Sequence, residues 1–166
     1  MEILSSFAGR HKETLASGRG KYLPPCIIVG VLNTDRTRDF TPTASAAGRD
    51  GKISIDAIPQ GGGSEAFSKF LTEELRPAID SAYRTNGWNM LIGHSYAGLF
   101  TLNTFLRHTE LFDTYLAVDP SLWWDQGRLV REAEALVAGR DFKGKACISV
   151  SRLKKGRTGW TFILTK

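Results

Sequence analysis

The chain has 166 residues, 42% of them hydrophobic, which suits a single domain with a packed core. Its formal net charge of +5 comes entirely from residues 152–166, which hold five basic residues and no acidic one. Residues 1–151 have a net charge of zero. A neutral body argues against a nucleic-acid partner. No apolar run approaches the roughly 18 residues of a membrane span, so we expect no membrane partner either.

The first predicted elements are a helix over residues 3–18 and a strand over 26–31. The helix has an apolar stripe, and the strand is a continuous β-branched run of the kind that is buried on both faces. Residues 33–60 are predicted to be a long polar loop with a short strand near 53–55. Residues 1–4 carry no signal-peptide pattern, which predicts a cytoplasmic protein if Met1 is the true start.

The second half alternates helices with strands. Ser64 is expected to cap a helix that runs to residue 82, and Pro77 should kink or restart it. The further predicted elements are strands over 89–93, 114–118 and 145–150 and helices over 96–107 and 128–137. Such alternation predicts an α/β fold with a mainly parallel sheet flanked by helices.

The segment Gly93-His94-Ser95-Tyr96-Ala97-Gly98 lies between a predicted strand and a predicted helix. A serine between small residues at a strand-to-helix turn is typical of the nucleophile elbow of serine hydrolases. Gly93 and Ala97 leave room for the tight turn, and the amide of Tyr96 would point at the reacting oxygen. The alternative is that Ser95 only caps a buried helix.

Several segments together resemble the putative-esterase branch of the α/β-hydrolase superfamily, which includes siderophore esterases and esterase D-like enzymes. Ala97 stands where the branch usually has glycine. The resemblance implies a partial α/β-hydrolase fold and hydrolysis of a small-molecule carboxylic ester through an acyl-serine, without a metal or cofactor. The matching segments are 23–31, 33–42, 61–63, 67–77, the elbow and 119–125.

The resemblance implies that Ser95 attacks, that the Tyr96 amide binds the oxyanion, and that a later histidine acts as base. None of the three histidines suits that role: His11 lies upstream, His94 adjoins the serine, and His108 ends the helix roughly 18 Å away. Residues 151–160 do not resemble the family. We therefore expect one hydrolase-like domain over 1–150, incomplete at both ends, and a divergent basic tail over 151–166.

Three functions remain open on this evidence. The first is a serine esterase, impaired because no suitable histidine is present. The second is a non-catalytic remnant or ligand-binding module of the same fold, and the third is an acyltransferase that uses the same residues. A sheet that lacks strands would also have an unpaired edge through which the chain could self-associate.

Four more side chains are candidates for substrate binding. Arg36 and Arg38 follow a predicted strand, where they would bind an anionic group or else form salt bridges with neighbouring aspartates. Trp123 and Trp124 would wall a pocket for the substrate or else belong to the core. Asp119 ends a predicted strand and is expected to serve the turn.

The remaining motifs have ordinary interpretations. Cys26 and Cys147 open apolar runs and are expected to be buried free thiols rather than a disulfide or metal site. Residues 61–64, Gly-Gly-Gly-Ser, lack the rest of a phosphate-binding loop and are expected to be a flexible entry to the following helix.

Overall fold

The computed structural model describes residues 26–32, 35–53 and 55–151. The chain divides into two units, residues 1–34 and 35–166. Residues 26–32 are the described part of the first unit, and the helices and strands named below belong to the second.

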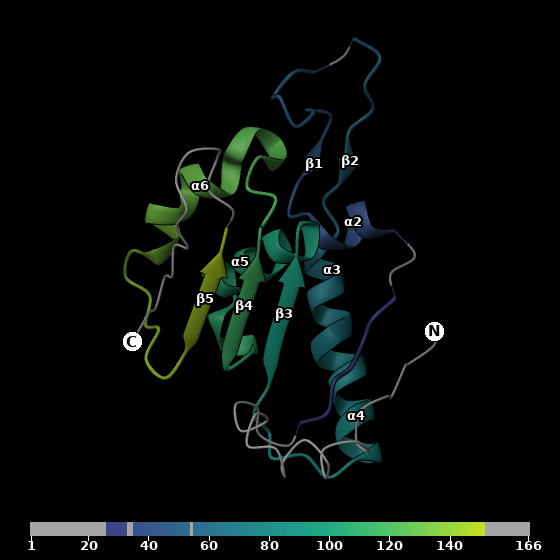
Figure 1. Ribbon diagram of the computed structural model, residues 1–166, viewed down its shortest axis with the longest axis vertical. Coiled ribbons are helices and arrows are strands. Elements are labelled where there is room, and N and C mark those ends of the chain that lie inside the picture. The colour runs from purple at the N-terminus through teal and green to yellow at the C-terminus, as the bar shows by residue number, and fades with distance from the viewer. Residues whose placement is uncertain (1–25, 33–34, 54, 152–166) are drawn as a thin grey trace, which may run out of the picture. The chain divides into compact units, whose positions relative to one another are not determined.

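A three-stranded parallel sheet forms the centre of the second unit, in the order β3 (Met90–His94), β4 (Thr114–Val118) and β5 (Ala146–Val150). Figure 1 shows the strands side by side and pointing the same way. Between β3 and β4 runs α5 (Tyr96–Arg107), and between β4 and β5 runs α6 (Trp124–Val137). The predicted α/β class, with a parallel sheet flanked by helices, is confirmed.

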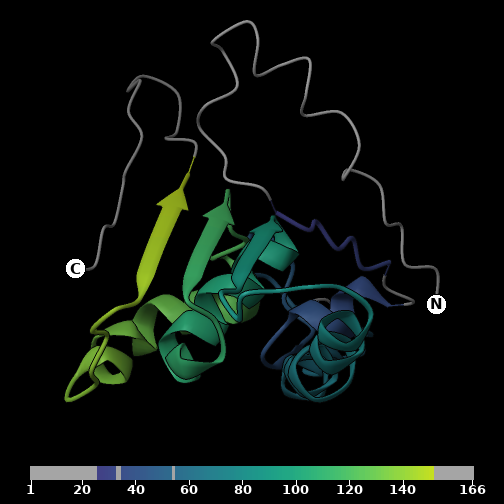
Figure 2. The same ribbon diagram turned by 90° about the horizontal axis from the view of Figure 1, so that it is seen from below.

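Helix α5 packs against β3 and β4. Strand side chains alternate between faces, and on the helix-covered face Tyr115 and Ala117 are fully buried. Figure 2 shows α5 and α6 on the same side of the sheet. Helix α5 is also buried by other helices: Leu99, 1% exposed, packs with Trp124 and Leu129 of α6, and Phe100, 2% exposed, packs against Phe67.

One long helical segment precedes β3. It consists of α3 (Ser64–Lys69), a π-helical stretch η1 (Phe70–Leu75) and α4 (Arg76–Ala82). The sequence predicts that Pro77 kinks or restarts the helix. It is the second residue of α4, where the segment changes from π-helix to α-helix while the backbone stays helical through Leu75 and Arg76, so the chain is not interrupted there. Rings from this segment reach the core: Phe67 packs edge-on against Phe100, with ring centroids 5.3 Å apart.

Two details of this segment differ from the prediction. Gly63, not Ser64, is the N-cap of α3, and no side chain caps the helix. The amides of Gly63 and Ser64 instead donate to the carbonyls of Arg38 and Thr41, at 2.8 and 3.2 Å. Because these loop carbonyls satisfy the helix start, a side-chain cap is not needed.

The stretch predicted as one long polar loop is more ordered than expected. It contains α2 (Arg36–Phe40), which begins where the Asp35 side chain accepts a hydrogen bond from the Arg38 amide. Strand β1 (Ala44–Ser45) then pairs antiparallel with β2 (Gln60–Gly61). In the predicted short strand near 53–55, Ile53 forms a β-bridge with Ala47, and residue 54 lies outside the described residues.

The glycines at the end of this stretch are tightly packed, which corrects the expectation of a flexible entry. Gly61 and Gly62 have φ of 95° and 87°, a left-handed conformation that favours glycine. A Cβ on Gly61 would lie 2.1 Å from Thr41 Oγ1, and one on Gly62 would lie 2.9 Å from the Ala44 amide nitrogen. The run therefore lets backbone segments approach closely.

Residues 26–31 do not form the predicted buried strand. Within 26–32 the structure has a single bridge residue, Gly30, and no strand, and Ile27 and Ile28 are 46% and 59% exposed. An apolar run becomes a buried parallel strand only where neighbours pair with both of its edges and cover both faces. Among the described residues, the parallel sheet consists of β3, β4 and β5.

The two cysteines differ in exposure, which corrects the expectation that both are buried. Cys147 in β5 is 2% exposed, whereas Cys26 is exposed. Burial raises the pKa of the Cys147 thiol to about 11, so it holds very little reactive thiolate at neutral pH.

We therefore expect a disulfide reagent such as DTNB at pH 8 to titrate Cys26 rapidly in the native protein and to reach Cys147 only after denaturant is added. Cys26→Ser should remove the rapid phase and leave the slow one. Rapid reaction of both thiols without denaturant would contradict the buried position of β5.

Within the described part of the chain, no helix combines the length and the apolar character needed to cross a membrane. Among the same residues, no group of three or more His, Cys, Asp or Glu side chains is arranged to hold a metal ion.

Candidate active site

Ser95 joins β3 to α5 through a backbone conformation that L-residues rarely adopt, with φ 60° and ψ −116°. Holding a residue there costs on the order of 1–3 kcal/mol, which the surroundings must offset. Ser95 precedes α5, but its side chain makes no capping hydrogen bond. An ordinary capping serine has extended φ and ψ and bonds to the helix amides, so the backbone here is that of a strained turn.

Backbone hydrogen bonds hold this turn. The Ser95 amide donates to the carbonyl of Val118 at the end of β4, at 3.0 Å. The Ser95 carbonyl accepts from the amides of Leu99 and Ser121, at 2.9 and 3.0 Å. The turn is thus anchored to its own helix and to the segment after the neighbouring strand.

Two glycines let the helix approach the sheet closely at this turn. A Cβ on Gly93 would lie 2.1 Å from the Ala97 carbonyl oxygen, and one on Gly98 would lie 2.9 Å from the Val118 carbonyl oxygen. Both distances are shorter than the contacts that real Cβ atoms make. Both are to backbone atoms, which cannot rotate out of the way as the end of a side chain can. The sequence analysis assigned the tight fit to Gly93 and Ala97, and the structure adds Gly98.

The Ser95 side chain is half-buried, and its hydroxyl lies 3.2 Å from the hydroxyl of Ser121. Ser121 is 5% exposed and follows β4 by three residues. Sequence reasoning missed it, although a signal was available: adjacent parallel strands end at the same sheet edge. Ser95 and Ser121 each come shortly after such a strand end.

Tyr96 is the first residue of the 12-residue helix α5. Its amide belongs to the first turn, where N–H groups have no acceptor inside the helix and the helix dipole favours negative charge. The amide therefore lies next to Ser95 at the start of the helix, and its role as an oxyanion donor stays a prediction.

Neither histidine that the structure describes contacts Ser95 in any recorded interaction. His94 precedes the serine and is exposed. His108 follows α5 and pairs through Nε2 with Glu65, at 2.9 Å, and through Nδ1 with Glu110, at 3.8 Å. His11 lies outside the described residues.

The chain is similar to proteins of a known family. The sequence pattern of the family described as "Putative esterase" fits residues 6–160. The chain belongs to this esterase family. Its strand, strained serine turn and helix are the parts that the family resemblance predicted.

Similar proteins include siderophore esterases. The chain is 33% identical to the ferri-bacillibactin esterase BesA of Bacillus subtilis and to a siderophore enterobactin esterase of Emericella nidulans, over 69% and 68% of its own length. A crystal structure of an IroE-like serine hydrolase from Shewanella oneidensis matches 76% of the chain with 40% identity and a TM-score of 0.69. The matches cover 42%, 39% and 40% of these three proteins, so the chain spans about two fifths of their length.

The paired tryptophans of the chain differ in burial. Trp124 is 6% exposed, packs with Leu99 and Leu129, and donates from Nε1 to the Thr43 carbonyl at 3.0 Å. Trp123 is half-buried, and its ring lies 5.8 Å from that of Tyr96. Trp124 is thus part of the core, and its ring also packs edge-on against Tyr96, with centroids 5.4 Å apart. Both tryptophans therefore lie beside the residue that follows the serine, and Trp123 is the less buried of the two.

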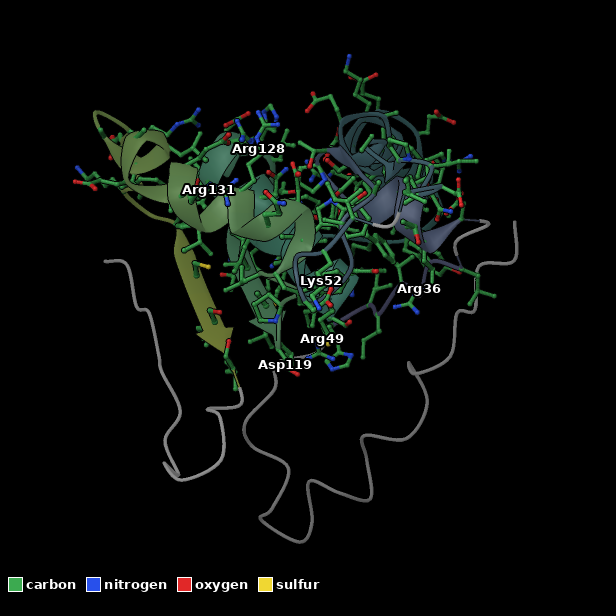
Figure 3. All side chains as sticks on the ribbon, turned by 90° about the horizontal axis from the view of Figure 1, so that it is seen from above. Arg36, Arg49, Lys52, Asp119, Arg128 and Arg131 are labelled. Carbon is green, nitrogen blue, oxygen red and sulfur yellow. The ribbon has the colours of Figure 1, made fainter. Side chains whose placement is uncertain are left out.

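The arginine pair sits on α2. Arg38 binds the Asp39 carboxylate at 2.7 Å, and this hydrogen bond and charge raise the pKa of the guanidinium. Arg36 is exposed on the outside of α2, and in Figure 3 it lies apart from Asp119. The salt-bridge interpretation accounts for Arg38, whereas Arg36 keeps an accessible side chain.

Asp119 follows β4 directly and is exposed, with φ 43°. Its amide donates to the Val150 carbonyl of β5 at 2.6 Å. This is the turn position that the sequence analysis expected.

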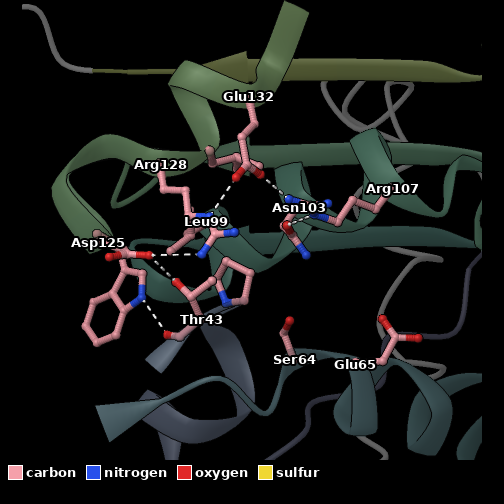
Figure 4. Close-up of a pocket in the computed structure, with 12 residues that line it drawn as sticks. Thr43, Ser64, Glu65, Leu99, Asn103, Arg107, Asp125, Arg128 and Glu132 are labelled. Carbon is pink, nitrogen blue, oxygen red and sulfur yellow. Dashed lines mark hydrogen bonds and ion pairs between the residues drawn. The ribbon is translucent and has the colours of Figure 1, made fainter. Parts of the chain in front are cut away.

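A cavity of about 280 Å³ lies among α3, α5, α6 and the segment before β1, and Ser95 is not among its lining residues. Figure 4 shows Glu132 bound by both Arg107 and Arg128. Their hydrogen bonds, that of Arg128 foremost, hold the pKa of the Glu132 carboxyl below its usual range. Arg128 also pairs with Asp125 at 3.8 Å, and Asp125 accepts a hydrogen bond from Thr43 at 2.8 Å. These bonds tie α5, α6 and the β1 segment together, which is a structural role.

Proposed function

We propose that this chain carries the nucleophile part of a serine carboxylic-ester hydrolase, with Ser95 as the residue that is acylated. The observation that supports this most is the backbone of Ser95, a non-glycine residue held at φ 60° and ψ −116° between a strand and a helix. Strain of this kind is retained where the surrounding structure enforces it, and it concentrates at reactive groups.

In the proposed reaction the Ser95 Oγ attacks the ester carbonyl carbon while a base takes the hydroxyl proton. The carbonyl π electrons move to oxygen, and the Tyr96 amide at the start of α5 donates to that oxyanion. When the intermediate collapses, the alcohol leaves with the proton from the base. Water then repeats the sequence on the acyl-serine and releases the acid.

The base is a histidine according to the family resemblance. The structure describes His94 and His108, and neither has a recorded contact with Ser95, so we assign the role to neither. Only one oxyanion donor, the Tyr96 amide, is assigned. Loss of one such donor costs about 10²–10³-fold in rate, so we expect modest turnover.

The proposed substrate class is a small-molecule siderophore ester. It rests on the similarity to the ferri-bacillibactin and siderophore enterobactin esterases, which are 33% identical to this chain. Arg36, exposed on α2, and Trp123, beside Tyr96, are the proposed substrate contacts. Enterobactin is accordingly the first substrate to test.

A second function has an observation in its favour. In the described residues, the recorded side-chain partner of the Ser95 hydroxyl is another serine and not a histidine. A non-catalytic module that retains the turn and binds a ligand would have the same geometry. Reactivity of Ser95 separates the two functions.

We expect a fluorophosphonate probe to label the native chain on Ser95, as mapped by mass spectrometry of the peptide that contains residues 90–107. The elbow makes the hydroxyl accessible and places helix amides beside it. Chain unfolded in urea before the probe is added serves as the control and should not be labelled. A native chain that stays unlabelled would favour the non-catalytic module.

A further inference from the structure

Ser121 makes two contacts with the turn at Ser95. Its amide donates to the Ser95 carbonyl at 3.0 Å, and its hydroxyl lies 3.2 Å from the Ser95 hydroxyl. The backbone contact supports the turn. The hydroxyl contact reaches the atom that is proposed to react, and turn support does not require it.

The surroundings of Ser121 limit what its hydroxyl can do. The residue is 5% exposed, so water has little access to it. Among the described residues, the Ser95 hydroxyl is the recorded hydrogen-bond partner of the Ser121 side chain. A serine hydroxyl offers one proton and two acceptor sites, so in the resting pair either oxygen can be the donor.

Attack on an ester removes this ambiguity. Once the Ser95 proton moves to a base, Ser95 Oγ can only accept hydrogen bonds. Ser121 must then be the donor in the pair, and its O–H points at the oxygen that is gaining negative charge. Hydrogen bonds to a charged oxygen are roughly twice as strong as those between neutral groups, so the contact is stronger during reaction than at rest.

We propose that Ser121 is a catalytic residue that donates its hydroxyl hydrogen bond to Ser95 Oγ as this oxygen becomes an alkoxide. The role rests on the proposed function of Ser95. In acylation the bond stabilises Oγ while the Oγ–carbon bond forms. In deacylation the bond between Ser95 Oγ and the acyl carbon breaks, and Ser121 donates a hydrogen bond to the departing Oγ. The base then gives Oγ the proton that it took from the attacking water. The proton of Ser121 itself is never transferred.

The replacement Ser121→Ala separates this role from turn support, because alanine keeps the amide that donates to Ser95 and removes only the hydroxyl. The matched control is Ser68→Ala in α3, another serine that is 5% exposed and lies outside the turn. Ser121→Thr keeps a hydroxyl at the same position.

The measurement is the rate of fluorophosphonate labelling at Ser95, in which Oγ bonds to phosphorus and fluoride leaves. We expect Ser121→Ala to label about 10–100-fold more slowly, the range for losing a hydrogen bond to a charged group. Ser68→Ala should label at the wild-type rate, and Ser121→Thr should be faster than Ser121→Ala. If Ser121→Ala loses its thermal unfolding transition, Ser121→Cys, a weak donor of similar size, replaces it and should label equally slowly.

The outcomes distinguish the two proposals. If the wild-type chain labels at Ser95 and the variant without the Ser121 hydroxyl labels just as fast, the role of Ser121 is overturned and the proposed function stands. If the wild-type chain does not label at Ser95, the proposed function fails and the role of Ser121 fails with it.

Discussion

Ser95→Ala should abolish the acyl-serine route, so that the modest ester hydrolysis expected of this chain falls to the background that its remaining groups support. The replacement removes the only atom proposed to bond to the substrate. Because Ser95 is half-buried and alanine is smaller, the fold should tolerate it. Initial rates with a p-nitrophenyl ester, followed by enterobactin, provide the measurement.

Ser68→Ala is the matched control, since it removes a serine hydroxyl from α3, away from the turn. It should keep the wild-type rate, and all three chains should unfold at similar temperatures. Turnover that survives in Ser95→Ala would show that another group performs the hydrolysis and would overturn the assignment of the nucleophile.

Gly93→Ala should destabilise the protein by about 3 kcal/mol, at the upper end for overpacking, and should abolish labelling of Ser95. The added Cβ would lie 2.1 Å from the Ala97 carbonyl oxygen and 2.6 Å from Thr101 Oγ1. The first of these atoms is backbone within α5, so the helix start must move away from β3. Urea denaturation, with the midpoint and slope compared to those of wild type, measures the loss of stability.

Substitutions at two other glycines provide comparisons for this loss of stability. Gly98→Ala should cost less, about 1–2 kcal/mol, because its nearest contact is 2.9 Å. Gly30→Ala adds a methyl group where nothing lies within 4 Å, and it should change stability by less than about 0.5 kcal/mol. Equal effects at all three positions would show that the elbow is not packed as described.

Several elements could be predicted from sequence because their signals are local. The helix after the serine has the predicted bounds, 96–107, since a glycine-serine turn begins it and apolar residues recur at helical spacing. Strand β4 also has its predicted bounds, 114–118. Pro77 lies just after the change from π-helix to α-helix, so its local signal locates that change, although the helix does not break there.

Other expectations failed where burial depends on distant segments. The apolar run 26–31 predicts a buried strand, yet Ile28 is 59% exposed, because such a run does not specify its sheet neighbours. Helix α2 was missed within a polar stretch. The burial of Phe40 that accompanies it comes from Phe67 and Phe100, far along the chain.

The sequence by itself determined the chemical character of the candidate site. It predicts a strand, a turn of small residues that holds Ser95, and a helix, an arrangement in which large side chains have no room beside the serine. Only the tertiary structure decided that Ser121 lies beside that serine and that Gly98 must be small. Both depend on parallel pairing of β3 with β4, which brings residues 26 positions apart to one sheet edge. Pairing between strands is a long-range interaction, and no local pattern in either segment specifies its partner.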